Sequence, residues 1–170
     1  MPGEWTPDDL PTGTFVFVEE GLLLLTLYLD KQSTCCNVYC EGTAILNYSE
    51  GAAEMQEHSY RVRAAEPSRI YYITPEDERR VTKVFPDYMC ASRKLTFRSF
   101  MKYVQRTRLF DYPRAERILL TDLYFPTILR APLKDLTEYL DLRTEEEKTI
   151  LADLQRKRLS PKSQLAANFN

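Results

Sequence analysis

The sequence has little of what most catalytic and metal sites require. It contains five glycines, and they form no glycine-rich loop of the kind that cradles phosphate. It contains one histidine, His58, so only Cys35, Cys36 or Cys40 is available to pair with it as a thiol–imidazole set. Cys35 and Cys36 are adjacent, which is not the spacing of a metal-binding pair. We therefore expect no enzyme, metal or cofactor; thiols in reducing cytosol are the favoured interpretation of the cysteines, and a redox or metal role is the alternative.

Long apolar runs and an excess of charge are absent as well. The apolar run GLLLLTLYL at 21–29 is shorter than the roughly 18 residues that a membrane helix needs, and acidic residues precede it, unlike a signal peptide. The net charge of −2 provides no overall basic field to attract nucleic acid. With 44% hydrophobic and 28% charged residues, the 170-residue chain can bury a core. We expect a cytoplasmic protein of one domain or two small ones.

The first half of the chain reads as β-structure. Short runs rich in β-branched, aromatic and leucine residues alternate with turn signals. In SYRVRA, side chains alternate so that Tyr60, Val62 and Ala64 share one face of a strand. Strands at this spacing predict a small sandwich or barrel. The runs are TFVFVEE, LLLLTLYLD, CCNVYCEG, SYRVRAAE and RIYYIT.

The periodicity becomes helical at Pro75, which follows Thr74, a good N-cap residue. A second helix is expected from about Pro86 to Leu109. It has basic residues and no acid over 93–108, a pattern typical of a solvated face and less often of a phosphate-binding one. Its apolar stripe either packs on the β-structure or pairs with a second copy of the chain. The stripe consists of Leu95, Phe97, Phe100, Met101 and Val104.

The last third of the chain predicts several short helices. In the first of them, Ala115, Ile118, Leu119 and Leu123 are expected to face inward. A short helix follows over PLKDLTEYLDL, with its leucines inward. Thr144 and the glutamate three residues later form a capping box for the next helix. Two short helices joined by a tight turn have the shape of a helix-turn-helix DNA reader.

This order of elements resembles the Crp–Fnr transcription regulators, most closely a subgroup common in Bacteroidetes. The resemblance is carried over about 13–159 by the segments FVFVEEGLLLLTLYLD, EGTAILNYSEG, HSYRVRAAEPSRIYYIT and AERILLTDLYFPTILRAPLKDLTEYLDL. It implies an α+β fold: a cyclic-nucleotide-binding-like β-barrel at 1–84, a dimerisation helix at 86–110 formed around the apolar stripe, and a winged-helix-type helix-turn-helix domain at 111–170. The family usually has helices before the barrel, so the barrel is expected to be short at its N-terminus.

The resemblance further implies a homodimer that reads double-stranded DNA at a palindromic site. The ligand cassette departs from the family pattern. Members that bind cyclic AMP hold its phosphate with an arginine followed by serine or threonine, and the matching positions here are His58 and Ser59. Histidine is charged only below about pH 6.5 and lacks the guanidinium fork. We therefore expect no response to cyclic AMP and a pocket that is empty or binds an unknown small-molecule effector.

The expected reading helix departs from the pattern too. It begins with Glu145, Glu146 and Glu147, and places Thr149 and Ile150 where the subgroup carries a Ser-Arg-like pair. Residues 132–159 contain six basic and seven acidic side chains, a net charge of −1, which predicts weak binding to phosphates. If the helix binds DNA, Lys148 and Thr149 are the candidate base or phosphate contacts, and the candidate backbone contacts are Arg143, Arg156 and Lys157. The alternative is a degenerate relative that acts as a protein-interaction or small-ligand-sensing module without DNA binding.

Overall fold

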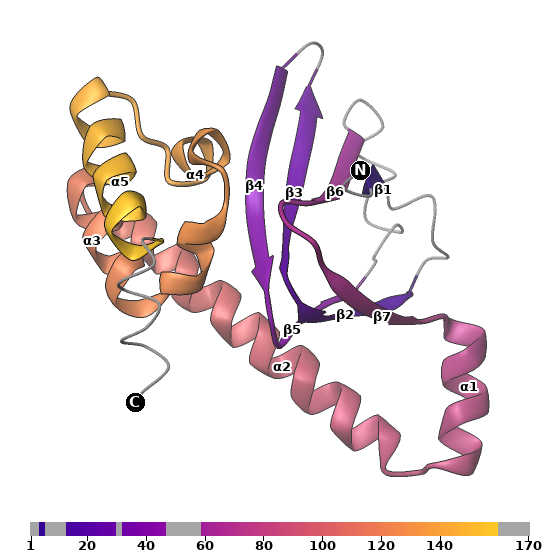
Figure 1. The fold of residues 1–170 in the computed structure, drawn as a ribbon. Helices are drawn as coiled ribbons and strands as arrows, with labels where there is room; N and C mark the ends of the chain where they lie inside the picture. The colour runs from indigo at the N-terminus through magenta and orange to yellow at the C-terminus, as the bar shows by residue number, and fades with distance from the viewer. Residues whose placement is uncertain (1–3, 6–12, 30–31, 47–58, 160–170) are drawn as a thin grey trace.

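The structure, a computed structural model, describes residues 4–5, 13–29, 32–46 and 59–159. Figure 1 shows the strands on one side of the molecule and the C-terminal helices on the other. Helix α2 (Tyr88–Thr107) runs along the base from helix α1 to the C-terminal helices. No helix in the described ranges is both long enough and apolar enough to cross a membrane.

The described strands form two antiparallel sheets and not a closed barrel, which corrects the predicted architecture. The four-stranded sheet has the order β1-β6-β3-β4, and the three-stranded sheet has the order β5-β2-β7. The chain passes from one sheet to the other at Gly21, whose φ of +94° and approach to Ser68 exclude a side chain. The strands are β1 (Glu4–Trp5), β2 (Phe15–Glu20), β3 (Leu22–Leu29), β4 (Gln32–Cys40), β5 (Thr43–Leu46), β6 (Ser59–Ala64) and β7 (Arg69–Ile73).

The alternation predicted for SYRVRA is confirmed. Val62 is buried, Tyr60 and Ala64 are half-buried, and Arg61 on the other face is exposed. Val62 pairs with Leu25 of β3 and packs in a small cluster that brings residues of both sheets together. The inward faces of the two sheets therefore bury apolar side chains against each other, as in a sandwich.

The helices begin and end close to where the sequence predicts. Thr74 caps the first one by accepting a hydrogen bond from the Asp77 amide at 3.2 Å. Two expectations are wrong. In α4, Leu133 is 39% exposed although the leucines of that helix were expected to face inward. In α3, Ile118 and Thr121 are buried, whereas Ala115 is exposed and Leu119 and Leu123 are 61% and 67% exposed. The buried stripe of α3 thus runs about one residue, or 100° of helix rotation, away from the predicted one. The helices are α1 (Pro75–Val84), α2, η3 (Arg108–Asp111), α3 (Arg114–Tyr124), η4 (Pro126–Arg130), α4 (Leu133–Tyr139) and α5 (Glu145–Arg158).

The largest apolar cluster joins the four-stranded sheet to the C-terminal helices. Leu24 and Val38 of the sheet belong to the same core as Leu136 of α4 and Leu151 of α5. Helix α4 covers the edge strand β4, where the Cys35 amide donates to the Glu138 carboxylate at 2.9 Å. Burial raises the pKa of the Cys35 thiol to about 12, so this cysteine is an inert packing residue. Covering β4 with a helix also explains why the sheet does not close on another strand.

Candidate nucleic-acid interface

Helices α4 and α5 are joined by a tight turn. The Asp141 amide donates to the Glu138 carbonyl at 3.1 Å, and the Leu142 amide donates to the Thr137 carbonyl at 2.9 Å. This pair of bonds is the Schellman motif, in which the first residue past the helix cap is left-handed and usually glycine. Here Asp141 takes that place with a φ of +55°.

Three arginines hold Asp141 in this unusual conformation. Arg114 donates to its carbonyl at 2.6 Å and to its carboxylate at 3.0 Å. Arg143 donates to the same carboxylate at 3.1 Å, and Arg117 lies 3.9 Å from it. Hydrogen bonding from Arg143, followed by that from Arg114, lowers the pKa of the Asp141 carboxyl below its ordinary value. The turn is therefore fixed by charge as well as by backbone hydrogen bonds.

The lowered pKa of Asp141 predicts a dependence of stability on pH. A carboxyl whose pKa is lower in the folded state stabilises that state above its unfolded pKa of about 3.9, and this contribution is lost as the pH falls through the folded pKa. We expect Asp141→Asn, which also tolerates a left-handed conformation, to reduce the slope of unfolding free energy against pH below about pH 4. The effect is small because the side chain is 42% exposed. Urea titrations between about pH 2.5 and 6 measure it; an unchanged acid slope would show that the ion pairs contribute nothing.

Arg117 connects the start of α3 to the same turn. Its guanidinium donates to the carbonyls of Tyr112 at 2.9 Å, Leu140 at 3.0 Å and Phe110 at 3.3 Å. It also lies over the Phe110 ring, 5.0 Å from the centroid. These carbonyls stand at the ends of η3 and α4, where helices leave their last carbonyls unpaired. Arg117 is thus a structural residue of the turn.

We expect Arg117→Ala to lower the free energy of unfolding by about 2–3 kcal/mol, because the side chain is mostly buried and leaves carbonyls without donors. Arg117→Lys keeps the charge but lacks the planar fork, so it should recover less than half of that loss. Chemical denaturation of the three proteins measures both values. Equal stability of the lysine and arginine forms would show that charge alone matters here.

The capping box at the start of α5 is confirmed. The Thr144 hydroxyl accepts from the Glu147 amide at 3.2 Å, and the Glu147 carboxylate accepts from the amides of Arg143 and Thr144 at 2.8 and 3.0 Å. These backbone hydrogen bonds lower the pKa of the Glu147 carboxyl. One of the three glutamates at the head of α5 therefore turns back toward the α4–α5 turn and caps the helix.

The side chains predicted to contact DNA all lie on α5 or just before it, and most are engaged within the chain. Arg143 pairs with Asp141, as above, and the Lys148 ammonium lies 2.7 Å from Glu145. The Thr149 hydroxyl donates to the Glu145 carbonyl at 2.7 Å. Arg156 pairs with Asp153 at 2.8 Å, and Lys157 is exposed near the end of the helix. The sequence did not indicate this pairing, since it depends on rotamers as well as on spacing.

Helix α5 is anchored along its inner face by a polar residue that sequence reasoning missed. Gln155 is buried, and its amide donates to the carbonyls of Leu129 and Ala131 at 2.6 and 2.8 Å. Arg158 adds two hydrogen bonds to Asp122 of α3, at 2.6 and 3.0 Å. These contacts fix which face of α5 points outward. That face carries Glu145, Glu146, Thr149, Ile150, Asp153, Arg156 and Lys157.

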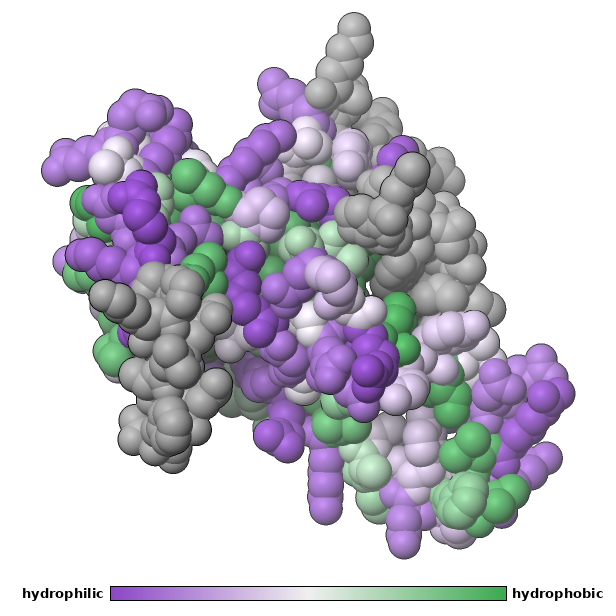
Figure 2. Space-filling view, viewed as in Figure 1, coloured by the Kyte–Doolittle hydropathy of each residue, from purple (hydrophilic) through white to green (hydrophobic). Residues whose placement is uncertain are grey.

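The apolar stripe predicted for dimerisation lies on α2 and is largely uncovered. Phe97, Phe100 and Met101 are 64%, 57% and 38% exposed, while Leu95 and Val104 are half-buried against the rest of the chain. Figure 2 shows further apolar residues around the α1–α2 turn, where Val84 and Phe85 are exposed. An uncovered aromatic surface of this kind is typical of an interface.

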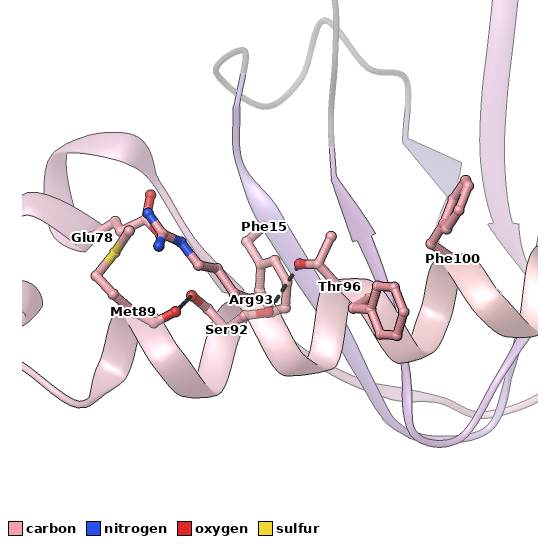
Figure 3. A pocket seen from close by; sticks show the side chains of 8 residues that line it. Phe15, Glu78, Met89, Ser92, Arg93, Thr96 and Phe100 are labelled. Atoms are coloured by element: carbon pink, nitrogen blue, oxygen red, sulfur yellow. Dashed lines mark hydrogen bonds between the residues drawn. The ribbon is translucent and has the colours of Figure 1, made fainter.

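A groove of about 540 Å³ opens beside this stripe, where β2, α1 and α2 meet. Figure 3 shows it with Phe15 of the strand, Glu78 of α1 and Phe100 of α2 along its walls. Within α2 the Thr96 hydroxyl donates to the Ser92 carbonyl at 3.0 Å. Phe97 and Phe100 line this groove and also belong to the stripe. A partner that covers the stripe could therefore also insert side chains into the groove.

Of the two residues predicted to line a ligand pocket, the structure describes one. His58 lies outside the described residues, and Ser59 is the first residue of β6, paired through its backbone with Tyr28. No group of acids, cysteines or histidine among the described residues is arranged to hold a metal ion.

No protein-family model and no curated protein sequence matches the chain. Solved structures do. FixK2 from Bradyrhizobium japonicum matches with a TM-score of 0.58 at 11% identity, over 93% of this chain and 86% of that one. The fold is similar to that of solved Crp–Fnr transcription regulators. The c-di-GMP-responsive global regulator CLP of Xanthomonas campestris matches with a TM-score of 0.54 at 18% identity, over 93% of this chain and 82% of that one.

A variant of CooA from Carboxydothermus hydrogenoformans matches with a TM-score of 0.54 at 11% identity, over 92% of this chain and 76% of that one. At these identities the similarity establishes the fold and leaves function to be argued from the site. The solved Crp–Fnr structures are of transcription regulators, which are not enzymes.

Proposed function

We propose that this chain is a dimeric, DNA-binding transcription regulator of the Crp–Fnr type that contacts double-stranded DNA through the outer face of α5. The observation that carries the proposal is the α4–α5 unit: a Schellman turn and a capping box fix two short helices and the turn between them, on a chain whose fold is similar to that of Crp–Fnr regulators. Two helices joined in this way are what a helix-turn-helix requires. A buried face anchored by Gln155 leaves the other face of α5 available to a groove of DNA.

The ion pairs within α5 weaken this interaction without abolishing it. Lys148–Glu145 and Arg156–Asp153 are exposed pairs spaced by three residues, which stabilise a helix by less than about 1 kcal/mol. A phosphate group can therefore replace the carboxylate as the partner of the cation. We expect modest affinity and a shallow dependence on salt, because few phosphates are neutralised without competition.

The first test is the double variant Lys148→Ala with Thr149→Ala. We expect it to weaken binding to a DNA fragment from the protein's own promoter region by about tenfold or more, since it removes a phosphate contact and a polar contact at the head of the reading helix. The matched control is Thr82→Ala with Lys83→Ala in α1, because the Thr82 hydroxyl donates to the carbonyl four residues earlier just as Thr149 does. If the two variants bind DNA with equal affinity, α5 is not the helix that reads DNA.

The finer parts of the proposal rest on the sequence resemblance and on the surface of α2. They are a cytoplasmic homodimer formed by the α2 stripe, a helix-turn-helix of the winged type, membership of the subgroup common in Bacteroidetes, and an effector other than cyclic AMP. The division at 1–84, 86–110 and 111–170 belongs with them. A two-fold dimer of this kind would bind a palindromic site with half-sites one helical turn apart, or a multiple of it.

A second candidate is a degenerate relative whose helical unit binds protein. The observation that favours it is the neutralised surface of α5, with Glu146 exposed and Ile150 38% exposed. This candidate predicts no retardation of any DNA fragment even at about 50 mM salt, where electrostatic binding is strongest.

A further inference from the structure

Arg106, in the last turn of α2, is a buried cation without an acidic partner. It is 3% exposed. One of its terminal nitrogens donates to the Val38 carbonyl, and its Nε is buried with no hydrogen-bond partner. No carboxylate of the described residues lies within ion-pair distance of it, whereas Arg63, Arg114 and Arg130 all have such partners. A buried guanidinium left in this state is costly, which calls for an anion.

Arg106 borders a cavity of about 220 Å³, which we call the hinge cavity. The cavity lies where three parts of the fold meet: the β4–β5 turn with Cys40 and Thr43, the end of α2, and the segment that leads into η4. Two cations line it, and no acid does. Its full lining is Cys40, Thr43, Lys102, Gln105, Arg106, Tyr124, Phe125, Pro126, Thr127 and Ile128.

Glu41 is the acid closest in sequence to a residue that lines the cavity, and it already forms an ion pair. Glu41, between Cys40 and Gly42, pairs with Arg130 at 2.5 Å, and Arg130 also pairs with Glu66 at 2.7 Å. Lys102 instead reaches toward the turn, where its ammonium lies 3.9 Å from the place a side chain on Gly42 would occupy. Within the described residues no acid pairs with Lys102 or Arg106, so both charges are available to something that enters from outside.

We propose that the hinge cavity binds a small oxyanion, a phosphate or a short-chain carboxylate. Charge-assisted hydrogen bonds from a guanidinium and an ammonium are the strongest that such an anion can find in a protein. Gln105 and Thr127 add an amide and a hydroxyl as neutral donors. The volume lies below the ~300 Å³ at which pockets for larger ligands begin, so the ligand is small.

The bound anion would contact the sheet, the α2 helix and the approach to α4 at the same time. An anion that bridges these elements stabilises their present arrangement, and with it the position of the helix-turn-helix relative to the stripe on α2. This regulatory consequence rests on the proposed function, whereas binding of the anion does not.

The test is calorimetric titration of the full chain with inorganic phosphate and, separately, with acetate, in a buffer that contains neither. We expect saturable binding of one anion per chain, weakened about tenfold or more by Lys102→Glu. The matched control is Lys94→Glu, the same change on an exposed residue of α2 outside the cavity, which should alter the affinity by no more than about twofold.

Thr127→Val provides a second variant that keeps the shape of the side chain and removes the hydroxyl; it should weaken binding without changing the charge. Circular dichroism checks that each variant is folded. Absence of binding to wild-type protein up to about 10 mM of either anion overturns the proposal, as does equal binding by the Lys102 and Lys94 variants. Because no DNA is present, these outcomes are independent of whether the chain binds DNA.

Discussion

Replacing Phe100 with aspartate is expected to convert a homodimer into monomers and to weaken DNA binding by at least about a hundredfold. Phe100 is 57% exposed in the single chain and lies in the centre of the α2 stripe, beside the groove that Phe15 lines. In the proposed dimer it is buried against the partner, where an unpaired carboxylate costs about 3–5 kcal/mol. A monomer also loses the second half-site of a palindromic target.

Sedimentation or light scattering measures the oligomeric state, and a gel-shift assay measures the affinity. The matched control is Tyr72→Asp on β7, which introduces the same charge at an aromatic residue that is 60% exposed but lies outside the stripe and the groove. The control protein should remain a dimer with unchanged affinity. If the Phe100 variant is a soluble dimer like the wild type, the interface lies elsewhere.

Replacing Glu145 and Glu146 with glutamine is expected to raise DNA affinity by about tenfold. Glu145 forms an ion pair with the ammonium of Lys148 at 2.7 Å. Both glutamates are exposed in the first turn of α5. A carboxylate about 4 Å from a phosphate costs roughly 1 kcal/mol even in water, so removing two of them is worth about a factor of ten or more. Without competition from Glu145, Lys148 neutralises its phosphate more completely, which steepens the salt dependence by at most about 0.9 in slope.

Glu147 is left in place in this variant because it caps the helix. The control removes two acids at the opposite end of the molecule, Glu76→Gln in α1 with Asp87→Asn before α2 (Figure 1). The control changes the net charge by the same amount. Any difference in DNA affinity between the two variants therefore comes from the position of the charges on α5. Affinity that rises equally in both would mean that only the overall charge matters, and affinity that falls in the first would mean that the carboxylates themselves contact bases.

The sequence predicted well what depends on neighbouring residues. The cap at Thr74, the capping box at Thr144 and the alternation around Val62 are local patterns, and all three are confirmed. The order of strands and helices supported a resemblance to Crp–Fnr regulators, and solved structures of such regulators have a similar fold although no sequence comparison finds a match.

What the sequence failed to predict depends on contacts between distant residues. The β4 edge of the four-stranded sheet is covered by α4, a contact between residues about a hundred positions apart. The inward face of α3 was misplaced because Leu119 and Leu123 fit a helical stripe as well as Ile118 does, and packing against α5, η3 and η4 decides between them. The arginine cluster around Asp141 and the buried amide of Gln155 carry no local signature at all.

The three glutamates at the head of α5 illustrate the same difference. Read as a run of charge, they oppose contact with DNA. In the structure Glu147 caps the helix and Glu145 pairs with Lys148. The two carboxylates therefore have different roles and do not oppose DNA binding equally. A reading helix can therefore keep this sequence at a cost in affinity that the Glu145 and Glu146 substitutions measure.

Selection from a random-sequence duplex library is a direct test of whether α5 reads DNA. The purified protein would be incubated with the library at about 50 mM and about 200 mM salt, with and without the small-molecule fraction of a cell extract, and the retained duplexes sequenced. We predict an enriched palindromic motif whose retention falls at the higher salt and is lost in the Lys148 and Thr149 double variant. If no motif is enriched under any of these conditions, α5 does not read DNA. That result would favour the second candidate, in which the helical unit binds protein.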